Sequence, residues 1–183
     1  AAGFLIFSLL YKERILVKPR NILESALSGI LFHGLYLGGC FYAFSIGVPA
    51  SITALIVSMQ PILTNLLAGP ILNEKVTWRQ WLGIVLGSCG TVLVLGLDVG
   101  QSIPKEGIII TTTSLFAATA GTLWQKKLSG NIPLSVSNFY QAIGASIFLF
   151  IIMCIFENPF IIFNIKFILS MSWQIIAVSF GAF

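Results

Sequence analysis

Apolar residues dominate this chain in long continuous runs, and short polar connections separate the runs. A helix needs about 20 residues to cross roughly 30 Å of hydrocarbon. Five runs meet this length: Leu23–Ile46, Ala50–Leu72, Trp78–Leu97, Gly107–Trp124 and Leu134–Phe156. Two partial spans, Ala1–Tyr11 and Trp173–Phe183, stand at the ends. The connections carry Pro, Gly and Asn, which end helices. The pattern predicts an all-α, polytopic transmembrane helix bundle whose neighbouring helices run antiparallel.

Composition excludes a soluble globule. Hydrophobic residues make up 57% of the chain, charged residues 9%, and the mean hydropathy is +0.97. A soluble domain carries roughly 25% charged residues on its wetted surface. A membrane β-barrel would alternate in polarity over segments of about 10 residues, and these runs do not. The lipid bilayer is therefore an expected partner. Because both ends fall inside apolar runs, we expect the chain to be a piece of a longer protein.

The Lys and Arg residues predict an orientation. If the connection after the first partial span is cytoplasmic, eight of the ten cations fall in cytoplasmic connections: Lys12, Arg14, Lys18, Arg20, Lys75, Arg79, Lys126 and Lys127. Only Lys105 and Lys166 fall on the other side. This asymmetry follows the positive-inside rule. The cations then act as topology signals, and we expect no nucleic-acid partner.

Two pairs of glycines have the spacing of a helix-packing motif. Gly34 and Gly38 form one GxxxG, and Gly83 and Gly87 form another. Small residues let helices approach closely in lipid. We favour packing within the bundle, since a polytopic protein has many internal contacts, and a homodimer is the alternative.

A proline in the second full span predicts a kinked polar helix. Pro61 lacks the backbone N–H that a helix interior needs. Gln60 and Thr64 share a face near it, and Asn65 points about 100° away. These side chains either line a polar cavity or form interhelical hydrogen bonds, and the sequence does not choose between the two.

The single histidine, His33, and the nearby Tyr36 are further candidates for a solute pathway. A buried histidine can bind a solute or relay a proton, or it can simply hydrogen-bond as a neutral imidazole. No carboxylate lies at mid-membrane, and the chain has no metal-ligand cluster or nucleophile–base motif. We therefore expect no enzyme activity, no metal and no cofactor.

A family resemblance rests on residues 42–96. The characteristic features are the turn Gly47-Val48-Pro49, the mid-helix Pro61, the pair Asn73-Glu74 at a helix end and a glycine-rich helix from Trp78. This stretch resembles the EamA domain of the drug/metabolite transporter superfamily. Pro61 and Glu74 match the family's Pro and Glu, and Asn73 stands where Gly is more usual.

The resemblance implies two inverted five-helix repeats, of which this chain is a fragment. Residues 1–97 would be the end of helix two and helices three to five, 98–106 the connection between the repeats, and 107–183 helices six, seven and the start of eight. Glu74 would mark a cytoplasmic helix end. The implied central cavity places five residues near the solute pathway: His33, Tyr36, Gln60, Thr64 and Asn65.

The function that the resemblance implies is transport of small solutes, such as amino acids, metabolites or drugs, by alternating access. The implied location is a bacterial inner membrane. A non-transporting scaffold or partner subunit is the main alternative, and a membrane-embedded enzyme is a weaker one.

Overall fold

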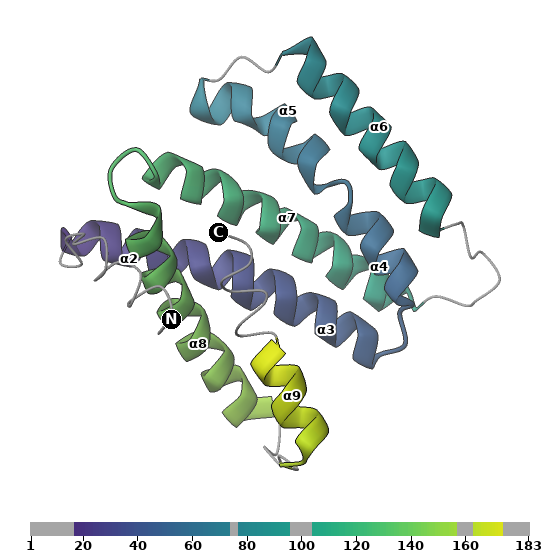
Figure 1. Ribbon diagram of the computed structural model, residues 1–183, viewed down its shortest axis with the longest axis vertical. Coiled ribbons are helices and arrows are strands. Elements are labelled where there is room, and N and C mark those ends of the chain that lie inside the picture. Colours follow the sequence, from purple (N-terminus) through teal and green to yellow (C-terminus); the bar gives the residue numbers. More distant parts are fainter. Residues whose placement is uncertain (1–16, 74–76, 96–103, 157–162, 174–183) are drawn as a thin grey trace.

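The computed structural model describes residues 17–73, 77–95, 104–156 and 163–173, and these form helices without any strand (Figure 1). The helices are α2 (Pro19–Gly29), the π-helix η1 (Ile30–Leu37), α3 (Gly38–Ser45), α4 (Ala50–Val57), α5 (Gln60–Leu72), α6 (Trp78–Leu95), α7 (Lys105–Leu128), α8 (Leu134–Phe156) and α9 (Ile165–Trp173). The predicted all-α bundle is confirmed.

Four helical segments in the described part of the chain are long and apolar enough to cross a membrane. They are Pro19–Ser45, Ala50–Leu72, Lys105–Leu128 and Leu134–Phe156. The remaining predicted span, Trp78–Leu97, corresponds to α6, which is not among these four. The two partial spans lie almost wholly outside the described residues.

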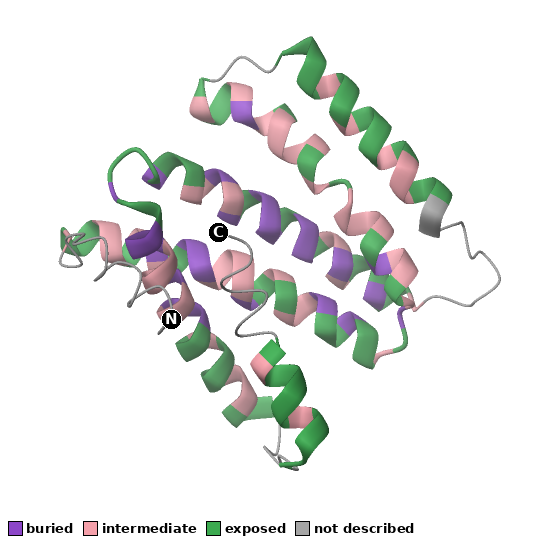
Figure 2. Cartoon of the chain, in the orientation of Figure 1, coloured by how far each residue is buried: buried purple, intermediate pink, exposed green. Residues whose placement is uncertain are grey.

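Helix α7 is the centre of the bundle. It packs against α2, η1 and α3 on one side and against α4 and α5 on the other (Figure 1). Helix α8 crosses α2 and η1, and α6 lies at the edge beside α4. Buried residues concentrate along α7 and at the α2–α8 crossing, whereas α6 and α9 are mostly exposed (Figure 2). A chain that spans lipid can leave such apolar helix faces exposed, because the hydrocarbon solvates them.

Helices α2 and α8 cross at backbone contact. A Cβ placed on Gly144 would lie 2.7 Å from the carbonyl oxygen and 2.8 Å from the Cα of Ala26. A Cβ on Gly29 would collide with the backbone of Gln141. Glycine is therefore required at both positions for this approach.

Buried polar side chains join the same helices. The hydroxyls of Ser25 and Ser137 lie 3.3 Å apart, and Nε2 of Gln141 donates to Ser137 at 3.1 Å. The hydroxyl of Ser28 donates to the carbonyl of Gly121 in α7 at 3.2 Å. The Ser25–Ser137 contact joins α2 to α8 and the Ser28–Gly121 bond joins α2 to α7, so they fix the relative register of three helices, while the Gln141 bond holds Ser137 within α8.

The first span contains a π-helical segment that the sequence did not predict. η1 carries His33 and Tyr36, and the ring of Phe32 makes aromatic contacts with both, at centroid distances of 5.1 and 5.7 Å. A π-helix is wider than an α-helix and turns by a smaller angle per residue, and such segments are rare and concentrate at functional sites.

Candidate functional site

The second span is two helices rather than one kinked helix. Helix α4 ends at Val57, a turn follows at Ser58 and Met59, and α5 begins at Gln60. Pro61 thus lies in the first turn of α5, where a missing N–H removes no intrahelical bond. The break predicted at Pro61 is present two to three residues earlier, since the proline starts the second helix. The amide of Met59 bonds to the carbonyl of Ile56 at 3.1 Å, which tightens the end of α4.

One face of the broken helix is turned toward α7. Nε2 of Gln60 donates to Oγ1 of Thr122 at 3.1 Å, and this hydroxyl donates to the carbonyl of Ala118 at 2.8 Å. Gln60 therefore makes an interhelical hydrogen bond. The hydroxyls of Thr53 and Thr64 are also enclosed, and neither has a hydrogen-bond partner among the described residues.

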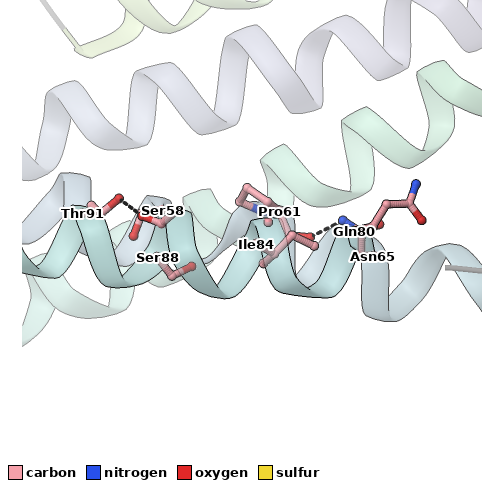
Figure 3. Close-up of a pocket in the computed structure, with 9 residues that line it drawn as sticks. Ser58, Pro61, Asn65, Gln80, Ile84, Ser88 and Thr91 are labelled. Atoms are coloured by element: carbon pink, nitrogen blue, oxygen red, sulfur yellow. Dashed lines mark hydrogen bonds between the residues drawn. The ribbon is translucent and has the colours of Figure 1, made fainter. Parts of the chain in front are cut away.

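The other face of the broken helix forms one wall of a groove, and α6 forms the opposite wall (Figure 3). The groove has a volume of about 520 Å³. Its described lining consists of Ser58, Pro61, Asn65, Gln80, Gly83, Ile84, Gly87, Ser88 and Thr91. Five of these nine residues have polar side chains and none is charged. Ligand pockets in proteins are typically ~300–1,000 Å³, so the groove is of a size to admit a small solute.

The groove runs along much of the length of α6. Gln80 lies in the first turn of α6 and Thr91 lies eleven residues later, which is about 16 Å at 1.5 Å per residue. This distance is roughly half the hydrocarbon thickness. A Cβ at Gly83 or Gly87 would meet no described atom within 4 Å, so this glycine pair leaves its part of α6 open. We call this feature the polar groove.

The structure divides the five predicted pathway residues among three places. Asn65 lines the polar groove, whereas Gln60 bonds to α7 and the hydroxyl of Thr64, four residues later on α5, is enclosed. His33 and Tyr36 lie on η1, and α7 stands between η1 and α5 (Figure 1). A single helical wheel could not foresee this division, because it depends on which neighbour each face meets.

The predicted packing glycines also differ from one another. Gly34 is buried in η1, where a Cβ would lie 2.7 Å from the ring of Phe148 in α8, and a Cβ on Gly38 would lie 3.5 Å from the side chain of Leu149. Gly83 and Gly87 border the polar groove instead. Glu74, the predicted cytoplasmic helix end, lies outside the described residues.

Charges are sparse near these features. Arg20 donates to Glu24 at 2.7 Å in the first turns of α2, and this pair lies toward the helix start rather than beside the groove. Across the described residues, no group of three or more His, Cys, Asp or Glu side chains could hold a metal ion. The described lining of the groove therefore offers only uncharged hydrogen-bonding groups.

Comparison with known proteins gives one family and several bacterial relatives. The sequence profile described as the EamA-like transporter family matches residues 1–96. Over 153 residues the chain is 28% identical to "Uncharacterized transporter YyaM" of Bacillus subtilis (strain 168), which covers 79% of this chain and 50% of that protein. Over 94 residues it is 27% identical to a "Probable amino-acid metabolite efflux pump" of Salmonella typhimurium, covering 51% of this chain and 31% of the pump.

A protein of the same printed name from Escherichia coli (strain K12) is 26% identical over 89 residues, which cover 48% of this chain and 30% of that pump. The chain thus spans half the length, or less, of these curated relatives. No solved structure matches.

Proposed function

We propose a role in solute transport for this chain, which belongs to the EamA-like transporter family. In this proposal, the polar groove forms part of the path that small solutes take through a multi-pass membrane protein. The groove is the observation that carries the proposal. A polar surface at membrane depth is unfavourable against lipid, because hydrocarbon cannot satisfy its hydrogen-bonding groups. Water or a polar solute can satisfy them.

The break between α4 and α5 supports transport by alternating access. Discontinuous helices near the membrane midplane are a recurring feature of secondary transporters, in which rigid parts rock about a central site. Here the turn at Ser58 and Met59 joins two short rigid helices, so α5 can tilt against α4 with little loss of hydrogen bonding. Ser58, at the turn, also lines the groove, and a tilt of α5 would change the groove's width.

The names of the relatives suggest the first substrates to test. Two of them are named probable amino-acid metabolite efflux pumps, and we extend this to propose amino acids and related metabolites for this protein. Because the relatives are bacterial, we place it in a bacterial inner membrane. We further propose that residues 1–97 and 107–183 belong to successive inverted repeats joined by 98–106.

The test uses the full-length protein in proteoliposomes. We expect uptake of at least one radiolabelled amino acid or related metabolite above that of empty liposomes. In a background with Cys40, Cys89 and Cys154 replaced by Ala, we expect Thr91→Cys to be inactivated by a water-soluble thiol reagent. Thr113→Cys, on the exposed face of α7 outside the groove, is the matched control. Equal inactivation of both variants, or no uptake of any metabolite, would refute the proposed pathway.

A further inference from the structure

His33 is an ionisable side chain near the middle of the first span, fourteen residues after Pro19 and twelve before Ser45. The side chain is half-buried, its nitrogens are not fully enclosed, and neither forms a hydrogen bond within the described part of the chain. A purely structural imidazole would be held by such a bond. Ionisable side chains inside a membrane usually mark a binding site or an ion pathway, because lipid penalises their charge.

The position of His33 separates it from the polar groove. Helix α7 stands between η1 and α5, so a solute in the groove does not touch the imidazole (Figure 1). Histidine is the side chain whose ordinary charge change falls between pH 5 and 8, which makes a proton the simplest ligand that it binds reversibly. A proton bound at His33 would therefore have to act on the groove through α7.

The charged groups on the surrounding helices lie away from the middle of the first span. Helices α2, α3, α7 and α8 pack against η1. Arg20 and Glu24 bond to each other near the start of α2, and the charges of α7 lie in its first and last turns. The other titratable side chains on these helices and on η1 are uncharged phenols and thiols: Tyr36, Cys40, Tyr42, Tyr140 and Cys154. Protonation of His33 would thus add a charge that no described residue beside it neutralises.

A continuous series of contacts leads from His33 to the wall of the groove. The rings of His33 and Phe32 touch edge to face at a centroid distance of 5.1 Å. The backbone of Phe32 lies against Gly121 of α7, where an added Cβ would be 3.1 Å from the Phe32 nitrogen. The next residue, Thr122, accepts the 3.1 Å hydrogen bond from Gln60 at the start of α5. Because α5 forms one wall of the groove, a displacement of η1 can reach the groove through tightly packed atoms.

From these observations we propose that His33 binds a coupling proton, so that a pH difference across the membrane drives solute through the polar groove. The inference rests on the proposed function, since it names the energy source of the same pathway. The imidazole takes a proton from water on one side of the membrane and returns it to water on the other side. Unlike η1 as a whole, this role requires one particular side chain, which can be replaced.

The first experiment compares two transport assays on the full-length protein in proteoliposomes, with a radiolabelled mixture of the protein amino acids as the probe. Valinomycin and equal K⁺ on both sides remove the membrane potential. We expect a pH difference of about one unit to change accumulation by up to about tenfold, for one proton per solute, and to change it in opposite senses for the two directions of the gradient. Counterflow, the exchange of labelled for unlabelled solute without a gradient, should proceed as well.

His33→Gln is the test variant and Tyr36→Phe is its matched control. His33→Gln should abolish the response to the pH difference and retain counterflow. Tyr36 is also half-buried on η1 and also contacts the ring of Phe32, at 5.7 Å, but its phenol does not change charge near neutral pH. Tyr36→Phe should therefore keep the response to the pH difference.

A second measurement detects the proton directly. Nuclear magnetic resonance of ¹⁵N-labelled histidine in nanodiscs, assigned by the signal that His33→Gln removes, should show titration between pH 5 and 8. The amino-acid mixture should move the midpoint of this titration, because coupling between two ligands is reciprocal. Gln60→Leu should reduce that movement, since it removes the bond between α7 and α5.

Several results would overturn the proposal. These are counterflow with no response to pH in the unmodified protein, an unchanged response in His33→Gln, an equal loss in Tyr36→Phe, or a His33 signal that does not titrate or ignores the solutes. Loss of counterflow together with the pH response in His33→Gln would assign the imidazole to the solute path instead. Absence of both uptake and counterflow in the unmodified protein would reject the proposed function itself.

Discussion

The α2–α8 crossing gives the sharpest test of the packing. In Gly144→Ala the new Cβ would lie 2.7–2.8 Å from the oxygen, Cα and Cβ of Ala26. Ordinary contact begins at 3.4 Å, so the two helices must separate by about 0.7 Å to clear the 2.7 Å contact. Most of the crowding comes from backbone atoms, which cannot rotate away. Crowding of this kind in a packed interior costs roughly 1–3 kcal/mol.

Two smaller terms complete the estimate. Separation of the helices would lengthen the 3.3 Å contact between Ser25 and Ser137 beyond hydrogen-bond range, and such bonds in membranes are worth ~0.6 kcal/mol. Replacement of Gly by Ala within a helix gains about 0.5–1 kcal/mol in the opposite direction. We therefore expect Gly144→Ala to lower the free energy of unfolding by about 2 kcal/mol.

The assay is reversible unfolding of the full-length protein in bicelles, with Gly87→Ala as the matched control. Gly87 is also a helical glycine in a membrane segment, but a Cβ there meets no described atom within 4 Å. The control should be unchanged or up to about 1 kcal/mol more stable. If Gly144→Ala is as stable as Gly87→Ala, the close backbone approach of α2 and α8 is wrong.

Three further predictions concern the first and second spans and their contacts with α7 and α8. Gln60→Leu and Thr122→Val should each lower the free energy of unfolding, and a double-mutant cycle should give a coupling energy of ~0.6 kcal/mol. Additive effects of the two substitutions would show that the 3.1 Å bond between Gln60 and Thr122 contributes nothing to stability. Pro61→Ala should change the free energy of unfolding by less than about 1 kcal/mol, because the proline ring lies in the first turn of α5. A change near ~3 kcal/mol, the cost of a proline in a helix interior, would mean that Pro61 does not lie in the first turn. Gly34→Ala should cost less than Gly144→Ala when both are measured by unfolding in bicelles, since the ring of Phe148 can rotate away; an equal or larger cost would mean that the ring is held rigidly.

Much of the fold could be predicted from the sequence, because the bilayer imposes simple rules. Apolar length decides which segments are spans, and the spans Ala50–Leu72 and Leu134–Phe156 have the predicted bounds in the structure. The approximate place of the helix break could also be predicted, since a proline cannot continue a hydrogen-bonded helix. Pro61 signalled the break, and its preference for the first turn of a helix explains why the turn precedes it.

The candidate site was less predictable. Asn65, Gly83 and Gly87 were singled out for their residue types, but nothing in the chain indicated that they border one groove. The hydrogen bonds of the groove hydroxyls were also invisible, because they depend on which carbonyl Ser58 and Thr91 each reach. The capping of Thr77 by Gln80 follows a known sequence signature and could have been found.

By itself, therefore, the sequence determined that this chain is a bundle of membrane helices, where most of them begin and end, and which family it resembles. The tertiary structure alone decided that Gln60 faces α7 while Asn65 faces α6. It also decided that Gly144 lies against the backbone of α2, whereas Gly87 has no described atom close to its Cβ position. The π-helical form of η1 is likewise seen only in the structure. The physical reason is that lipid is as apolar as a leucine side chain. A membrane helix consequently shows no polar and apolar faces that identify its neighbours, and only the packed helices decide which face meets which.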